Sequence, residues 1–328
     1  MVLIISQNED SIINPILRYL VYFKIKFIRI TEDTKVCLEQ IELNNLITDF
    51  RLSIYNPTLK KIIFLNYSEI KFVWHRRGYF NIERNFQFEE DYLRKYFQEE
   101  YSYLNNFIKY KFSLIPHLNK QSDERINKLA VLDKAKVIGL LIPDTLISKN
   151  INCINDFIYL NESIITKAIN SGAIYKNENM TIGCGTIKIT TKDINENSES
   201  LSLLSLFQKN VIKKFDIRIF YINKQFFASA ILSQKNPKTR IDFREYDSQT
   251  PNRIIPIQLP NEIVVKLSTL MHELNINSGS IDMIYSESNQ FIFLEVNPVG
   301  QFEQVYIPCN YNIDIYIASL IKSKYEGI

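Results

Sequence analysis

The sequence predicts a mixed α/β fold, α+β in its later parts, divided into more than one domain. Short β-rich runs alternate with helically spaced segments over the first third of the chain, a pattern typical of a small layered α/β structure. In the last third, two pairs of β-rich runs are each joined by a short polar turn, as in antiparallel hairpins. A chain of 328 residues is long enough for two or three domains.

The first third is expected to begin with a strand and to end with a long helix. The opening run Met1–Ser6 lacks a basic leader and turns polar at once, so it indicates a strand and not a signal peptide. Apolar residues then recur at strand or helix spacing along this part of the chain. The elements expected are a helix at 12–21, strands at 26–30, 61–65 and 70–74, and an amphipathic helix at 88–107.

The middle third is expected to hold shorter elements separated by polar or small residues. Gly139 ends the first helix of this part, because glycine readily adopts the backbone conformation that follows a helix. The expected order is a linker at 116–123, a helix from about 123 to 137, a strand at 146–147, apolar runs at 157–160 and 164–168, a flexible segment at 170–173, a hairpin arm at 180–191 and a polar loop at 196–202.

The last third is expected to be built on two hairpins with helices around them. The second hairpin is the more informative one, because it carries acidic residues within apolar strands. The expected order is a hairpin of 217–222 and 226–231, a helix at 260–274, a hairpin of 281–284 and 291–297 with a tight turn at Ser288-Asn289, and a closing helix at 311–322.

Composition excludes several classes of protein. The formal net charge is only +3, so bulk charge implies no polyanion-binding surface, and any phosphate site must be local. Four cysteines, at 37, 153, 184 and 309, are far apart and form no Cys-x-x-Cys pair, as expected of reduced thiols in a cytosolic protein. No apolar run approaches the length of a membrane span.

The last hairpin predicts a metal site. With the turn at Ser288-Asn289, Asp282 lies directly opposite Glu295, and Asn297 projects from the same face as Glu295. Facing carboxylates in an apolar ribbon need a cation, and three oxygen ligands suit Mg²⁺ that keeps waters and phosphate oxygens as further ligands. On the hairpin alone, an interpretation of equal weight is that both acids simply face solvent.

Four cations elsewhere could complete a nucleoside triphosphate site. They are Lys128, Lys167, Arg218 and Arg244, each at the edge of an element or inside a strand-rich run. Gathered around the acidic residues, they would neutralise phosphates that Mg²⁺ bridges. The chain has no Gly-x-x-x-x-Gly-Lys-Ser/Thr loop, so it is not a P-loop enzyme, and it shows no Ser-His-Asp or Cys-His pairing. Taken singly, each lysine is more often a solvated charge.

Two adjacent arginines follow the strand at 70–74. Arg76 and Arg77 come after Trp74, the only tryptophan, and would face a ligand crevice if this strand ends in an open α/β sheet. An alternative of equal weight is a surface pair of arginines beyond a core tryptophan. The three histidines, at 75, 117 and 272, have no metal-ligand spacing.

Together these motifs resemble those of the ATP-grasp ligases, and more narrowly of the peptide maturases that make graspetides, which are cyclic peptides with ω-ester links. The likeness is greatest to the grasp-with-spasm group. It covers nearly the whole chain. The motifs that carry it are Trp74-His75-Arg76-Arg77; Lys128, Gly139, Pro143 and Thr145; Lys167; the run Gln208-Lys209-Asn210-Val211; Asp216-Ile217-Arg218; Asp242-Phe243-Arg244; Asp282, Glu295 and Asn297; the run 297–302; and Cys309-Asn310-Tyr311.

The resemblance implies a role for each of these residues. Lys128 and Lys167 would contact ATP phosphates, and the linker Gln208, Lys209, Asn210 and Val211 would bind adenine through its backbone. Asp282, Glu295 and Asn297 would be the Mg²⁺ ligands. Arg244 would stabilise the acyl phosphate and the tetrahedral oxyanion, with Arg218 beside it. Two positions depart from the family pattern: many ligases have Glu where Gln208 stands, and a small residue is expected where Glu303 stands.

The resemblance also implies a fold and an activity. The fold would be ATP-grasp, with an N-terminal pre-ATP-grasp α/β domain at 1–120, a central subdomain with a phosphate-covering loop at 121–207, and a C-terminal subdomain with an antiparallel sheet at 208–328. The activity would be ATP-dependent macrocyclisation of a precursor peptide, through acyl phosphates of Asp or Glu, into esters with Ser or Thr or amides with Lys. The alternative is an ATP-grasp ligase that adds free amino acids to a protein or small-molecule carboxylate.

The implied cofactors are ATP and two Mg²⁺ ions, and the implied partner is a ribosomally made precursor peptide with a leader, with no nucleic acid and no membrane. A cytoplasmic location and a homodimer are also expected. The arm at 180–191 is a candidate leader-docking surface. An equally weighted alternative is that this arm merely covers ATP.

Overall fold

The computed structural model describes residues 1–84, 87–121, 126–170, 174–176, 181–183, 185–196, 203–245 and 247–328, with the backbone alone at 174–176 and 181–183. The chain forms two compact units, one of Met1–Glu124 with Asn312–Ile328 and one of Arg125–Tyr311. The three-part division at 120 and 207 stays a prediction. Within the described residues, no helix is both long and apolar enough to span a membrane.

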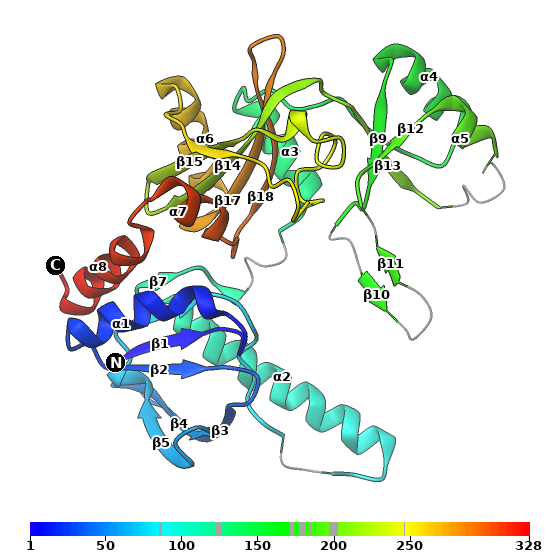
Figure 1. Cartoon of the computed structure of the whole chain (residues 1–328). Helices are drawn as coiled ribbons and strands as arrows, with labels where there is room; N and C mark the ends of the chain where they lie inside the picture. Colours follow the sequence, from blue (N-terminus) through cyan, green and yellow to red (C-terminus); the bar gives the residue numbers. More distant parts are fainter. Residues whose placement is uncertain are drawn as a thin grey trace. The chain divides into compact units, whose positions relative to one another are not determined.

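The first unit contains the expected α/β structure, with strands that pair in parallel (Figure 1). The order of their sheet is β2-β1-β6-β7, formed by β1 (Val2–Ile5), β2 (Phe27–Ile30), β6 (Phe72–His75) and β7 (His117–Leu118). All four residues of β1 are buried, as an interior strand of a covered sheet requires. The unit also contains α1 (Asn14–Tyr22), α2 (Asp91–Ser113) and α8 (Ile313–Glu326), and α8 packs beside α1 although the two are far apart in sequence.

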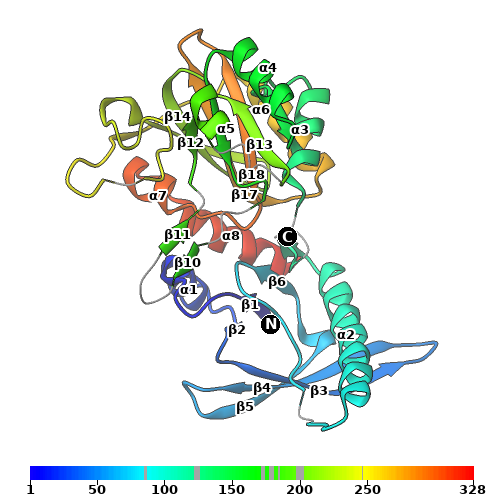
Figure 2. The ribbon, with the colours of Figure 1, turned by 90° about the vertical axis from the view of Figure 1, so that its right-hand side faces the viewer.

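A second, antiparallel sheet in this unit was only partly expected. It consists of β3 (Lys35–Leu43), β4 (Thr48–Asn56) and β5 (Lys61–Asn66), and Figure 2 shows it separately from the parallel sheet. The sequence predicted β5 and missed the other two strands. A register shift between Leu38 and Gln40 interrupts the alternation of β3, which hides its two-residue period. In β4, Phe50, Leu52 and Ile54 alternate inward into the core.

The second unit contains two antiparallel sheets. The smaller has the order β12-β9-β13-β8, with β8 (Thr145–Ser148), β9 (Ile164–Lys167), β12 (Ile187–Ile189) and β13 (Ser205–Lys209). Two helices, α4 (Ile151–Asn161) and α5 (Thr191–Glu196), share its small core, which includes Ile154, Ile164 and Phe207. A separate hairpin is formed by β10 (Ile174–Lys176) and β11 (Thr181–Gly183).

Several expectations for this region fall partly outside the described residues. They are the linker at 116–123, the flexible segment at 170–173, the arm at 180–191 and the polar loop at 196–202. The helix expected from about 123 is α3 (Lys128–Val137), and residues 122–125 are among those not described. Asn127 caps α3, because its side-chain oxygen accepts hydrogen bonds from the amides of Leu129 and Ala130. Gly139 follows the helix at φ +86°, as expected of a helix stop.

The larger sheet of the second unit carries most of the candidate site. Its order is β16-β15-β14-β17-β18, with β14 (Lys213–Ile222), β15 (Gln225–Ile231), β16 (Ile254–Pro256), β17 (Ser278–Ser286) and β18 (Phe291–Asn297). Both predicted hairpins of the last third are therefore confirmed. The core under this sheet is shared with α3 and α6 (Asn261–Glu273) and includes Ile219, Leu267 and Phe293. The short helix α7 (Glu303–Cys309) follows β18.

Candidate active site

The last hairpin has the predicted pairing, with Asp282 opposite Glu295. Its turn is longer than expected: the amide of Ser286 donates to the Gln290 carbonyl, and Asn289 lies at φ 62°. The longer turn alone would move the carboxylates out of register. A bulge at Leu294, between the pairs Met283–Phe293 and Asp282–Glu295, restores it.

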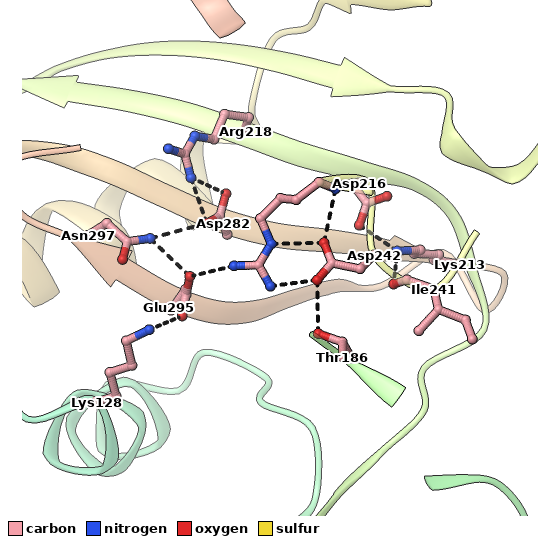
Figure 3. Close-up of polar contacts among 11 residues, drawn as sticks. Lys128, Thr186, Lys213, Asp216, Arg218, Ile241, Asp242, Asp282, Glu295 and Asn297 are labelled. Carbon is pink, nitrogen blue, oxygen red and sulfur yellow. Dashed lines mark hydrogen bonds and ion pairs between the residues drawn. The ribbon is translucent and has the colours of Figure 1, made fainter. Parts of the chain in front are cut away.

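Asn297 completes this patch from the same strand as Glu295. It pairs with Ser280, two residues before Asp282, so its side chain lies on the same face. The amide nitrogen of Asn297 donates to Glu295 Oε1 at 3.0 Å and to Asp282 Oδ2 at 3.3 Å. The three predicted metal ligands therefore converge, as Figure 3 shows.

Two of the predicted cations contact these carboxylates directly. Lys128 Nζ, at the start of α3, donates to Glu295 Oε2 at 2.8 Å. Arg218 lies on β14 opposite Asp282, and its Nη1 donates to both Asp282 oxygens, at 2.7 and 2.6 Å. The two contacts come from different elements, so the tertiary fold brings together charges that are far apart in sequence (Figure 3).

Arg244 is held by Asp242, two residues before it. Asp242 Oδ1 accepts from Arg244 Nε at 2.8 Å, and Asp242 Oδ2 accepts from Nη2 at 2.6 Å. The remaining terminal nitrogen, Nη1, lies 4.0 Å from Glu295 Oε1. Burial would raise the pKa of Asp242, but hydrogen bonds from Arg244 and Thr186 outweigh it and lower the pKa to about 2. Asp242 is therefore an ionised partner of Arg244 and a poor proton acceptor.

A second buried pair lies next to this loop. Lys213 Nζ donates to Asp216 Oδ1 at 2.6 Å and to the Ile241 carbonyl at 3.0 Å, and Ser233 Oγ donates to Asp216 Oδ2 at 2.6 Å. Burial raises the pKa of Asp216, and the contacts with Lys213 oppose it. Lys213 therefore ties the residue before Asp242 to the larger sheet.

The two facing carboxylates have opposite electrostatic tendencies. Burial raises the pKa of Asp282, and the neighbouring charge of Glu295 adds to this, while Arg218 opposes it. Burial would also raise the pKa of Glu295, but Lys128 and the Asn297 amide reverse the effect and lower the pKa to about 2. Glu295 is therefore the firmly ionised member of the pair.

Lys167 lies in the same cleft, at the end of β9. Burial lowers its pKa; Glu295 opposes this, and the positive charges of Lys128 and Arg244 add to it. Additional negative charge near Lys167 Nζ would favour the ammonium form.

Two adjoining cavities occupy the cleft. One is lined by the predicted linker residues 208–211 together with Pro143, Ile165 and Leu294. The other, of about 280 Å³, is lined by Lys128, Asn297 and Arg218. Seven residues line both cavities, so the cavities adjoin along them: Lys167, Thr186, Gln208, Arg244, Asp282, Leu294 and Glu295. All the predicted site residues therefore lie around one cleft.

Gln208 borders the cleft but is almost fully buried, and its side-chain amide is engaged within the fold. Its amide nitrogen donates to Thr145 Oγ1 at 2.9 Å, and Thr145 Oγ1 donates to the Pro143 carbonyl at 2.9 Å. The role of Gln208 is thus to join β13 to the start of β8. This explains how glutamine can stand where many ATP-grasp ligases have glutamate.

The residues present fit a magnesium ion. Asp282 and Glu295 supply hard carboxylate oxygens, and Asn297 would add its amide oxygen after rotation of the amide, whose nitrogen now faces both carboxylates. The described residues contain no group of three His, Cys, Asp or Glu side chains placed to hold a metal. A metal here would therefore depend on this amide and on oxygens from outside the chain.

The segment after β18 packs closely on β17. The Gln301 carbonyl accepts hydrogen bonds from Ser280 Oγ at 2.8 Å and from Arg218 Nη2 at 3.4 Å. A Cβ added at Gly300 would clash with Ser280, so only glycine fits at this position. Glu303 is exposed in the first turn of α7, where an acid is favourable, so it does not disturb the loop.

The arginine pair after β6 is divided between two environments. Arg76 is buried, and its Nε lies 3.3 Å from Asp10 Oδ2. Burial lowers its pKa to about 10, and Asp10 opposes the shift. Trp74 is buried as expected, but a surface position is wrong for Arg76, and Arg77 is half-buried.

Three contributors to the site were missed from the sequence. Thr186 Oγ1 donates to Asp242 Oδ2 at 2.9 Å, Lys213 holds Asp216, and Leu294 forms the bulge. A signal for Lys213 was present, because it stands three residues before Asp216. Regular alternation would place two residues with this spacing on opposite faces, and the register shift between Lys213 and Phe215 overrides it.

No protein-family model and no curated protein matches the chain. Solved structures do. It is similar to an ATP-grasp ligase of Chryseobacterium gregarium that is associated with ribosomally synthesised, modified peptides (RiPPs) and was solved with ADP and a leader and core peptide: 23% identity, TM-score 0.82, covering 98% of this chain and 96% of that one.

Macrocyclases of Microcystis aeruginosa MRC are also similar. For MdnC, bound with precursor peptide MdnA, the identity is 25% and the TM-score 0.76, covering 98% of this chain and 99% of that one. For MdnB the values are 19% and 0.72, with 98% of each chain covered. The resemblance expected from the sequence is thus confirmed for the fold: over nearly its whole length, this chain has the ATP-grasp fold of peptide-modifying ligases and macrocyclases.

Proposed function

We propose that this chain is an ATP-dependent peptide macrocyclase, a graspetide synthetase. It would activate Asp or Glu side chains of a ribosomal precursor peptide as acyl phosphates and join them to Ser or Thr hydroxyls as esters, or to Lys amines as amides. The observation that carries the proposal is the single cleft in which two carboxylates and an amide face four cations from separate elements. Support comes from the likeness to a macrocyclase bound with its precursor peptide.

In this proposal the cavity beside residues 208–211 receives the adenine ring. The amides of Lys209 and Asn210 already donate to the carbonyls of Asp144 and Ser163, at 2.9 Å each. Among the described backbone amides of residues 209–211, the amide of Val211 would therefore donate the hydrogen bond to adenine. Ile165 and Leu294 supply the apolar walls that a flat ring needs.

Lys128 and Lys167 would bind the phosphates, and Asp282, Glu295 and Asn297 would hold two Mg²⁺ ions. When bound, Mg²⁺ draws negative charge from the transferring phosphate. Lys128 would then exchange part of its contact with Glu295 for a phosphate oxygen. Phosphate charge near Lys167 Nζ would raise the pKa that burial has lowered.

Arg244 and Arg218 would stabilise the charge that develops on the acyl group. A peptide carboxylate attacks the γ-phosphorus, and the bond to the bridging oxygen breaks to release ADP. The hydroxyl oxygen of Ser or Thr then attacks the acyl carbon, the hydroxyl proton is lost, and phosphate leaves as the ester forms. Arg244 Nη1 lies on the side of the guanidinium that faces Glu295, where it can donate to the oxyanion. No covalent enzyme intermediate is needed, because catalysis rests on positioning and charge.

We also propose a cytoplasmic location and a homodimeric assembly. In the described part of the chain Cys153 and Cys309 are free thiols, in keeping with a reducing compartment. We propose separately that the leader peptide docks on the arm at 180–191, several residues of which lie outside the described ones.

The experiment is co-expression with a short Thr-rich and Glu- or Asp-rich peptide encoded beside this chain. Mass spectrometry should show the loss of one water per bond, and the loss should disappear with Glu295→Gln. A product heavier by an amino-acid residue would instead indicate ligation of free amino acids. An unmodified peptide with no ADP formed would contradict the proposal.

A further inference from the structure

We propose that Thr186 is a positioning residue that sets the direction of Arg244 by holding Asp242. This inference rests on the proposed function, in which Arg244 acts on the acyl group. Thr186 precedes β12 in the smaller sheet, whereas Asp242 and Arg244 belong to the loop between β15 and β16. The hydroxyl of Thr186 points at the Asp242 carboxylate, as Figure 3 shows.

The hydrogen bonds of Asp242 show why this one contact matters. Oδ1 accepts from the Arg244 amide at 3.0 Å and from Arg244 Nε at 2.8 Å. Oδ2 accepts from Arg244 Nη2 at 2.6 Å and from Thr186 Oγ1 at 2.9 Å. Three of these four bonds are local to the loop and would survive if the loop moved as a whole. Of these four hydrogen bonds, only the one from Thr186 relates Asp242 to another element.

Arg244 needs a contact from another element to fix its orientation, because much of its side chain is exposed to solvent. Its side chain is 56% exposed, and long exposed side chains sample many rotamers unless they are held. Asp242 grips Nε and Nη2, which leaves Nη1 directed at the carboxylate patch, 4.0 Å from Glu295 Oε1. The orientation of this free nitrogen therefore follows the orientation of Asp242.

Contacts near Asp242 tie the loop to two different sheets. Lys213, on β14, donates to the Ile241 carbonyl and ties the loop to the larger sheet. Thr186 ties Asp242 to the smaller sheet, where the next residue, Ile187, pairs with Thr166, the neighbour of Lys167. Through β12 and Asp242, the Thr186 hydroxyl thus connects β9, which carries Lys167, to Arg244, the arginine proposed for acyl transfer.

The test uses three variants with nearly the same side-chain volume or chemistry. Thr186→Val keeps the shape and removes the hydroxyl, and Thr186→Ser keeps the hydroxyl. The matched control is Thr190→Val. Thr190 Oγ1 also donates to an aspartate, Asp193 Oδ2 at 2.6 Å, but it does so at the start of α5 and away from the cleft.

Cyclisation of the peptide encoded beside this chain should depend on the hydroxyl. Relative to the unaltered enzyme, kcat of Thr186→Val should fall about 10- to 100-fold, the usual effect of removing a partner that orients a site residue. Thr186→Ser and Thr190→Val should stay within about threefold, and all variants should bind Mg²⁺ with the non-hydrolysable analogue AMPPNP within about twofold.

A double variant shows whether Thr186 acts through Arg244. In an Arg244→Met background, which slows the reaction, adding Thr186→Val should change the remaining rate by less than about twofold, because the group it orients is gone. Equal loss in Thr186→Val and Thr186→Ser, an unchanged kcat in Thr186→Val, or a rise in the AMPPNP dissociation constant that accounts for the loss would each overturn the inference. If the unaltered enzyme fails to cyclise the peptide, the proposed function fails and this inference fails with it.

Discussion

Replacing Asp282 by Asn and Glu295 by Gln should abolish activity alike, yet the two substitutions should differ in their cost to stability. Both remove a proposed metal ligand while keeping the side-chain shape. They differ in the cation that each carboxylate neutralises, which is Arg218 for Asp282 and Lys128 for Glu295.

The structure sets the size of the difference. The side chains of Arg218 and Asp282 are 10% and 7% exposed, so Asp282→Asn leaves a buried guanidinium without its counter-charge, at a cost of about 3–5 kcal/mol. Lys128 is 26% exposed and can turn towards water, so Glu295→Gln should cost less, at most about 3 kcal/mol from the shift of the Glu295 pKa from 4.5 to about 2. Glu295→Gln is therefore the cleaner test of the metal assignment.

The assay is urea unfolding followed by far-UV circular dichroism, without nucleotide and with a chelator present. Trp74, the single tryptophan, lies in the other compact unit, so its fluorescence does not report directly on this site. The same preparations are then tested for ADP formation with peptide and Mg²⁺. The reasoning about burial is refuted if the two variants lose equal stability. The metal assignment is refuted if folded Glu295→Gln turns over at the normal rate.

Two further predictions concern the loop that carries Arg244. Because the folded-state pKa of Asp242, about 2, lies below its ordinary 3.8, its contribution to stability is complete above about pH 4 and is lost as pH falls towards 2. Asp242→Asn should thus lower the free energy of unfolding at pH 7 by at most about 2 kcal/mol, and by less because solvent screens half-exposed Arg244. In urea titrations at pH 3, the difference in free energy between the variant and the unaltered protein should be smaller. A difference that stays constant with pH would contradict this prediction. Lys213→Met should lower the free energy of unfolding by about 3–5 kcal/mol, because it leaves Asp216 buried without its partner. The control Lys214→Met alters an exposed neighbour and should cost less than about 1 kcal/mol in the same titrations. Similar losses in the two variants would show that burial of the pair is not the cause.

Regular local patterns were enough to predict much of the fold. Short apolar, β-rich runs identified β1, β5 and β6, and helical spacing identified α2 and α6. The same approach failed at β3, where a register shift interrupts the alternation. Patterns of period two or 3.6 reveal an element only while its backbone stays regular.

In the candidate site, too, the prediction from sequence depended on regular backbone structure. Asp282 was placed opposite Glu295 from a turn one residue shorter than the real one, and the prediction holds because the bulge at Leu294 offsets the longer turn. The sequence contained no sign of that compensation. A bulge is selected by packing against neighbouring strands, which the sequence of one hairpin does not record.

The sequence was enough to predict which charged and amide residues form the site, because carboxylates, an amide and cations in these motifs rarely occur together for another reason. It was not enough to predict which of these residues pair with one another. Whether Lys128 meets Glu295, Arg218 meets Asp282, or Thr186 meets Asp242 depends on contacts between residues 56 or more positions apart. Such contacts form only when whole sheets pack, since hydrophobic burial, and not any local preference of these polar residues, brings their strands together.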